Sequence, residues 1–262
     1  MSSAARPRAR SYKIENFYDH VKNPKDTSFQ HYDNEEVINI KLPARILSCA
    51  PSGKGKTNVI MNLMKGINKW HHVILLAKDL DEPLYKHVID TYRALEKKHG
   101  VKILLAINSF DDLPDIDKDF PPDPTENTLA IFDDLICESE KDLAKLKPWF
   151  TRGRKKEVTM CFLSQGFFDI PKLIRKNCNY VMLKQMDNEQ DLKRIIREYA
   201  MGCTPKELTA MYQHALTGPY MDDSLSDQEV QHRAFFMIDR STTDPKLKYR
   251  ANFDPIDGPL LK

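Results

Sequence analysis

A dense turn of small residues follows a short apolar run near position 50, and an amphipathic segment begins directly after it at Lys56. In a P-loop, backbone N–H groups and a lysine hold the phosphates of a nucleotide at the start of a helix. The P-loop pattern G-x-x-x-x-G-K-[ST] maps onto residues 50–57, with Ala50 at the first glycine position. The predicted nucleotide-binding residues are Ser52, Gly53, Lys54, Gly55, Lys56, Thr57 and Asn58.

Within this pattern, Lys56 is expected to reach the β- and γ-phosphates, and the Thr57 hydroxyl is expected to ligate Mg²⁺. Ala50 departs from the pattern. An alanine there costs little if its φ is negative, but it costs about 1 kcal/mol or more if φ must be positive. A glycine-rich turn before an ordinary helix is the alternative interpretation.

A second acidic element is needed, because a carboxylate at the end of a strand must hold the magnesium from its far side. The segment LAIFDD ends in Asp133 and Asp134. Asp133 is the expected magnesium-side residue, and Asp134 is placed to orient or deprotonate the attacking water. Alternatively, both aspartates cap the turn after an ordinary strand. Many ATPases have the longer glutamate at the position of Asp134.

Two further features favour hydrolysis over binding alone. Gln165 ends the strand candidate VTMCFLSQ, where its amide can hydrogen-bond the γ-phosphate or position water; a turn that satisfies a polar strand end is the alternative. Just before that strand, FTRGRKKE presents Arg152 and Arg154. These arginines could form a solvated face, contact DNA or act as an arginine finger for a neighbouring subunit. The sequence alone does not show which of Arg152 and Arg154 would be the finger.

Composition sets wider limits. The 262 residues include 40 basic and 38 acidic side chains, so the net charge of +2 says little about partners. No run of eighteen apolar residues exists and the N-terminus lacks the apolar core of a signal peptide, so we expect a protein without a membrane span that is not secreted. The five cysteines have neither zinc-site nor disulfide spacing, and we expect reduced, mostly buried thiols.

The remaining chain must position these residues. Residues 1–34 are polar and irregular and predict a mobile arm or strap, whereas 35–262 predict one domain. Strands are expected at 44–50, 72–77, 102–107, 128–135, 158–165, 180–185, 234–239 and 246–253. Helices are expected at 56–68, 83–99, 138–150, 188–200 and 204–216. Strands that are apolar throughout predict an α/β fold, with a mostly parallel sheet flanked by helices and a small C-terminal strand pair.

The order of these motifs resembles a known family. APSGKGKT, LAIFDDL, FTRGRKKEVTMCFLSQGFFDIPKLIRKN and FFMIDRSTTDPKLKYRANFD are similar to segments of the genome-packaging ATPases of the FtsK/HerA superfamily, in the branch of poxviruses, other large DNA viruses, virophages and polinton-like elements. The resemblance covers residues 40–254. It implies a RecA-like P-loop NTPase core with Lys56 and Thr57 as the Walker A pair, Asp133 and Asp134 as the Walker B pair, Gln165 as the polar sensor, and Arg152 or Arg154 as the finger.

The resemblance also implies a function and partners. It implies a homo-oligomeric ring that hydrolyses ATP with Mg²⁺ and drives double-stranded DNA into a preformed capsid. The expected partners are DNA and a capsid or portal-vertex protein, in the virion or in the host cytoplasm or viral factory. Candidate DNA contacts are Lys155, Lys156, Lys172, Arg175 and Lys176, for which a solvated surface is the alternative. A nucleoside or small-molecule kinase and a nucleotide-gated capsid assembly protein remain as alternative functions.

Overall fold

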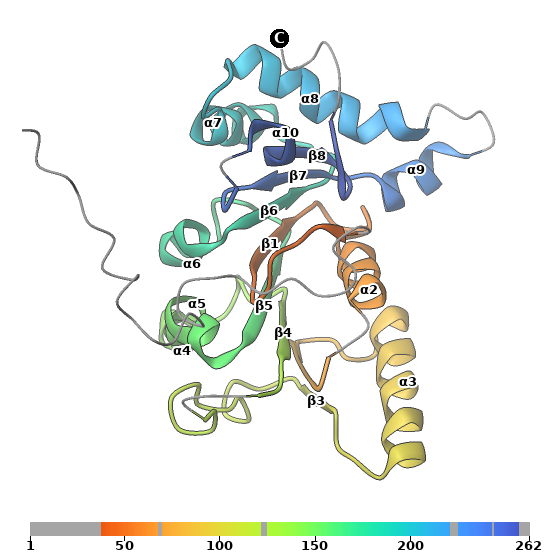
Figure 1. Ribbon diagram of the computed structural model, residues 1–262, viewed down its shortest axis with the longest axis vertical. Helices are drawn as coiled ribbons and strands as arrows, with labels where there is room; N and C mark the ends of the chain where they lie inside the picture. The colour runs from red at the N-terminus through yellow and green to blue at the C-terminus, as the bar shows by residue number, and fades with distance from the viewer. Residues whose placement is uncertain (1–37, 68–69, 122–124, 221–224, 243, 257–262) are drawn as a thin grey trace, which may run out of the picture.

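The computed structural model describes residues 38–67, 70–121, 125–220, 225–242 and 244–256 (Figure 1). The expected arm at 1–34 lies outside the described residues, so its extent and role stay predictions.

A single sheet runs through the described part of the chain, with nine strands in the order β3-β2-β4-β5-β1-β6-β7-β8-β9. The first six strands in this order pair in parallel. Each of the last three, β7, β8 and β9, runs antiparallel to the strand before it in the order. The strands are β1 (Arg45–Cys49), β2 (His72–Ala77), β3 (Leu104–Ile107), β4 (Thr128–Asp133), β5 (Val158–Ser164), β6 (Tyr180–Leu183), β7 (Phe236–Asp239), β8 (Tyr249–Ala251) and β9 (Asp254–Pro255). The expected α/β fold is confirmed, and the C-terminal strands extend the same sheet.

Both faces of the sheet are buried, as the continuous apolar strands predicted. Side chains alternate along a strand, so Leu47 and Cys49 of β1 pack into the hydrophobic cluster on one face, while Ile46 packs into the cluster on the other. All seven residues of β5 are buried. The strands that carry the predicted site are therefore held rigidly from both sides.

Helices cover both faces (Figure 1). α2 and α3 supply the core of one face, whereas α5, α6, α7 and α8 supply the core of the other. The helices are α2 (Lys56–Gly66), α3 (Pro83–His99), α4 (Glu140–Lys145), α5 (Lys147–Arg152), α6 (Lys172–Asn177), α7 (Glu189–Tyr199), α8 (Pro205–Thr217), α9 (Asp227–Arg233) and α10 (Pro245–Lys248), with short 3₁₀ turns η3 (Gly153–Lys156) and η4 (Gly218–Tyr220). The start of α8 is fixed by a capping box between Thr204 and Glu207.

Strand order decides which residues meet. β5 lies between β1 and β4, so the P-loop strand and the strand that ends in Asp133 are not neighbours. The ends of parallel strands nevertheless share one edge of the sheet, and this carboxyl edge gathers the residues that follow β1, β2, β4 and β5. The connector 108–127 contains no strand or helix in its described residues and runs to the opposite, amino edge, where β4 begins.

Candidate active site

The loop between β1 and α2 has the geometry of a phosphate-binding turn. Gly53 and Gly55 have φ of 74° and 75°, in the left-handed region that favours glycine. Ala50 is not among the residues with positive φ, and its N–H donates to the Ser164 carbonyl at 3.1 Å. The alanine at the first glycine position is therefore unstrained, and the departure from the pattern has no backbone cost.

The first turn of α2 is prepared for an anion. The helix has no side-chain cap and no acidic residue in its first turn, so its N–H groups and the helix dipole face the loop. A pocket of about 700 Å³ opens there, lined in part by Ser52, Gly53, Gly55, Lys56, Thr57 and Asn58. Six of the seven predicted nucleotide-binding residues belong to this lining, and Lys54 does not. The Lys54 Nζ donates to Gln231 Oε1 of α9 at 3.0 Å.

Lys56 and Asp133 meet across the inserted strand β5. Lys56 Nζ lies 3.0 Å from Asp133 Oδ1, with side chains only 12% and 7% exposed. The other oxygen, Asp133 Oδ2, accepts a 2.6 Å hydrogen bond from the Tyr85 hydroxyl. Asp133 Oδ1 has the ion pair but no hydrogen bond, although it is buried. One oxygen of this carboxylate is therefore available to a new ligand.

These residues fit a magnesium ion. Glu82 lines the same pocket as Lys56 and Thr57. Partial burial raises the pKa of the Glu82 carboxyl, and the Asp133 carboxylate raises it further, while Lys56 and the Thr57 hydroxyl lower it. A divalent cation would relieve this concentration of negative charge. The described residues contain no group of three or more acidic, histidine or cysteine side chains able to hold a metal alone. Mg²⁺ does not need one when phosphates and water complete its shell.

Asp134 and Gln165 also lie together. Gln165 Nε2 donates to the Asp134 carboxylate oxygens at 3.2 and 3.3 Å, and both residues line the pocket. Asp134 has a φ of 55°, an uncommon conformation that aspartate tolerates better than most residues. The turn directs its side chain to the carboxyl edge, toward Gln165. The pair can hold a water between an acceptor and a donor.

Other pocket residues were missed by the sequence interpretation. Glu82 follows β2, and Glu229, His232 and Arg233 come from α9; all four line the pocket. The acidic run after β2 was a usable signal for Glu82, because strand ends at one edge converge. No motif marks α9, which lies far from the P-loop in sequence.

Arg152 and Arg154 are not in the pocket of their own chain. They belong to α5 and η3, which precede β5, whereas Gln165 follows it. Seven residues of strand separate the two edges by roughly 20 Å. Arg152 forms a 2.5 Å ion pair with Asp117. A catalytic role for either arginine therefore requires a second subunit.

The candidate DNA contacts divide into two groups. Lys155, Lys172 and Lys176 are exposed. By contrast, Lys156 donates to the Phe120 and Pro121 carbonyls. Arg175 donates to the Ile170 carbonyl, lies 3.6 Å from Glu198 and stacks on two phenylalanine rings. The three exposed lysines are the better candidates for phosphate contacts.

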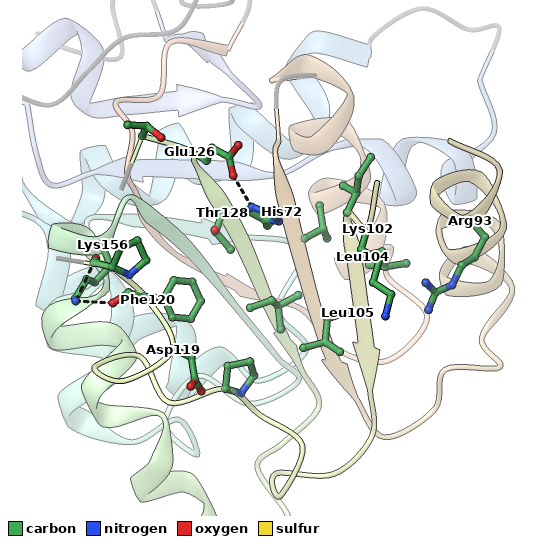
Figure 2. A pocket seen from close by; sticks show the side chains of 16 residues that line it. His72, Arg93, Lys102, Leu104, Leu105, Asp119, Phe120, Glu126, Thr128 and Lys156 are labelled. Carbon is green, nitrogen blue, oxygen red and sulfur yellow. Dashed lines mark hydrogen bonds and ion pairs between the residues drawn. The ribbon is translucent and has the colours of Figure 1, made fainter. Parts of the chain in front are cut away.

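A second cavity of about 490 Å³ lies near the amino edge and contains none of the predicted catalytic residues (Figure 2). The edge strand β3 and the connector 108–127 contribute to its walls, and the His72 and Glu126 side chains pair beside it at 2.8 Å. Its lining mixes apolar groups with charges of both signs. Of these two cavities, the one at the P-loop contains the phosphate-binding turn and Thr57, a predicted magnesium ligand.

Two wider expectations can be compared with the structure. All five cysteines are free; Cys49, Cys161 and Cys178 are buried, while Cys137 and Cys203 are exposed or partly exposed. In the described part of the chain, no helix has both the length and the apolar character needed to cross a membrane.

A family model described as "Poxvirus A32 protein" matches residues 30–217, which is most of the chain. No curated protein matched the sequence.

Solved structures with a similar fold include the genome packaging NTPase B204 of Sulfolobus turreted icosahedral virus 2, at 11% identity and a TM-score of 0.49, over 77% of this chain and 94% of that chain. EccC of Thermomonospora curvata follows at 11% identity and a TM-score of 0.40, over 55% and 31% of the two chains.

Proposed function

The chain belongs to the poxvirus A32 protein family, and we propose that it is an ATP-hydrolysing motor that drives double-stranded DNA into a viral capsid. The observation that carries the proposal is the convergence of Lys56, Asp133, Asp134 and Gln165 at one edge of the sheet, beside a P-loop. Four groups from three strand ends supply a phosphate cation, a magnesium carboxylate and a pair that can position water.

Nucleotide binding begins with a change of partners. The Lys56 ammonium leaves Asp133 and contacts the β- and γ-phosphates, while the N–H groups of the P-loop and the first turn of α2 bind phosphate oxygens. Asp133 is then free, with Thr57, to hold Mg²⁺. Mg²⁺ held by these two residues would neutralise the negative charge that develops as the bond between the γ-phosphorus and its bridging oxygen breaks.

Hydrolysis requires a water in line with the γ-phosphorus. Asp134 accepts a hydrogen bond from that water and orients or deprotonates it, and Gln165 hydrogen-bonds the γ-phosphate or the same water. In the resting geometry these two side chains hold each other, so the water-positioning pair exists before the substrate arrives. This preorganisation lowers the cost of reaching the transition state.

A ring supplies what one chain lacks. Since Arg152 and Arg154 lie at the amino edge, one of them reaches the γ-phosphate of a neighbouring subunit. The exposed Lys155, Lys172 and Lys176 bind the DNA backbone without reading its sequence. The capsid or portal-vertex protein receives the ring.

Steady-state ATP hydrolysis with and without linear duplex DNA, at two salt concentrations, tests the proposal. We expect turnover to rise with DNA and the rise to shrink as salt increases, because phosphate contacts release counterions. Lys56→Ala is the control for contaminating ATPases. A hydrolysis rate that DNA does not change at either salt concentration would contradict the proposed motor function and favour a kinase or a nucleotide-gated assembly protein.

A further inference from the structure

The last turn of α9 is fixed against the phosphate-binding loop. His232 Nε2 lies 3.0 Å from the Gly53 carbonyl oxygen, to which it donates. The His232 carbonyl in turn accepts from Asn58 Nδ2 at 2.9 Å and from Lys184 Nζ at 3.0 Å. Lys184 is fully buried at the end of β6. The end of α9 is thus attached both to the loop and to the sheet behind it.

The two segments also touch through their backbones. A Cβ atom added to Gly55 would lie 2.9 Å from the His232 carbonyl oxygen, closer than real Cβ contacts. The Lys54 side chain bonds to Gln231 on the same helix. The loop and the end of α9 therefore keep a fixed relative position, and the residue after His232 has a fixed place at the nucleotide pocket.

That residue is Arg233, whose side chain is 52% exposed and lines the pocket. Its acidic neighbour Glu229 is 3.9 Å away, through Oε1, while Glu229 Oε2 accepts hydrogen bonds from Ser226. The two lysines that line the pocket have shorter ion pairs: Lys56 at 3.0 Å and Lys78 at 2.8 Å. Among the lysine and arginine side chains of the lining, Arg233 has the longest ion pair.

We propose that Arg233 is a phosphate-binding arginine that acts on the nucleotide held by its own chain. Its planar guanidinium can donate two parallel hydrogen bonds to phosphate oxygens, which compete readily with a 3.9 Å contact to Glu229. This inference rests on the proposed ATP site, but it concerns a different arginine from the one supplied by the neighbouring subunit.

Equilibrium binding on the full chain tests the contact. A non-hydrolysable ATP analogue with Mg²⁺ and, separately, ADP are titrated into wild type, Arg233→Ala and Arg233→Lys. We expect Arg233→Ala to weaken binding of the triphosphate analogue by roughly 10- to 100-fold, as for a lost charge-assisted hydrogen bond. The loss of ADP affinity should be smaller, and Arg233→Lys should recover part of the affinity for the analogue. Arg93→Ala is the matched control, because Arg93 is 53% exposed and pairs with a helical glutamate, Glu96.

Unchanged affinity for both nucleotides in both Arg233 variants would overturn the proposal. If Arg233→Ala unfolds, Arg233→Gln and Arg233→Lys give the same comparison. If wild type binds neither nucleotide, the proposed function fails first, and the two failures are thus distinguishable.

Subunit mixing then tests whether Arg233 acts within its own chain. Mixing Arg233→Ala with Lys56→Ala should not restore hydrolysis, because every site then lacks one residue of its own chain. Restored hydrolysis would assign Arg233 to the neighbouring site and overturn the inference.

Discussion

The ion pairs at the two edges of the sheet differ in how far they are buried. At the carboxyl edge, the Lys56–Asp133 pair is 12% and 7% exposed, and its members come from two strand ends. At the amino edge, the Arg152–Asp117 pair is 53% and 48% exposed. A buried pair has lost much of its hydration and depends on its partner, whereas a half-exposed pair is largely solvated. Charge alone therefore does not identify the site; the burial of paired charges around an open pocket does.

The largest effect is expected when an arginine at the amino edge is removed from the ATP site at the carboxyl edge of a neighbouring subunit. Arg152→Ala or Arg154→Ala, whichever removes the finger, should lower turnover by about 10³- to 10⁵-fold, because the transition-state charge loses its arginine. The measurement is ATP hydrolysis by each variant alone and after mixing with Lys56→Ala. Mixing should restore activity, since some sites then combine an intact P-loop with an intact arginine. Without any restoration, the shared site would have to be abandoned.

The next effect is confined to the carboxyl edge. Asp134→Asn should bind ATP normally but hydrolyse it about 10²- to 10⁴-fold more slowly, because the amide accepts protons poorly. Nucleotide titration and single-turnover hydrolysis separate the two quantities. Asp111→Asn is the control, since Asp111 is 89% exposed and pairs with Lys145. Weakened ATP binding in Asp134→Asn would instead give Asp134 a role in holding the nucleotide or its metal.

A pH-dependent stability should distinguish Lys184 from the exposed lysines. Burial lowers the pKa of Lys184 to about 8. Between pH 8 and 10.5, the unfolded chain binds this proton more tightly, so rising pH favours the folded state, by about 3 kcal/mol at most. Urea unfolding of wild type and Lys184→Met across this range is the measurement. The difference between the two proteins should grow with pH; a constant difference would contradict the lowered pKa.

The smallest effect is expected at the amino edge. Glu126→Gln removes the carboxylate that pairs with His72, where both side chains are about half exposed. The free energy of unfolding should change by less than about 1 kcal/mol, and less still at high salt. Chemical denaturation at low and high salt measures it. A loss of several kcal/mol would remove the distinction between the edges.

A part of the fold or of the candidate site could be predicted where its residues form a contiguous pattern in the sequence. The P-loop pattern is contiguous, so the glycine-rich turn and the start of α2 at Lys56 could be predicted from the sequence. The positions of Asp133, Asp134 and Gln165 could also be predicted, because each lies at the end of a strongly apolar strand; their catalytic roles stay predictions. Glu82 was missed, because strand order, which places β2 beside β4, is a tertiary property.

The contribution of α9 was even less accessible. Its contact with the P-loop joins residues such as Asn58 and His232, 174 positions apart, and depends on a backbone carbonyl that no sequence pattern records. The sequence could single out Arg152 and Arg154 by residue type, but only the fold shows that β5 separates them from the P-loop of their own chain.

Strand β5 has one further consequence. It is hydrogen-bonded to a neighbour on both sides, and all seven of its residues are buried, so it can neither stretch nor bend independently. Gln165 follows one end, and the arginines precede the other. In a ring of the proposed kind, β5 of each subunit would thus be a rigid connection between two ATP sites. Movement of Gln165 when phosphate leaves one site would shift the arginine that reaches into the ATP site of the neighbouring subunit. The subunits would then hydrolyse ATP one after another around the ring.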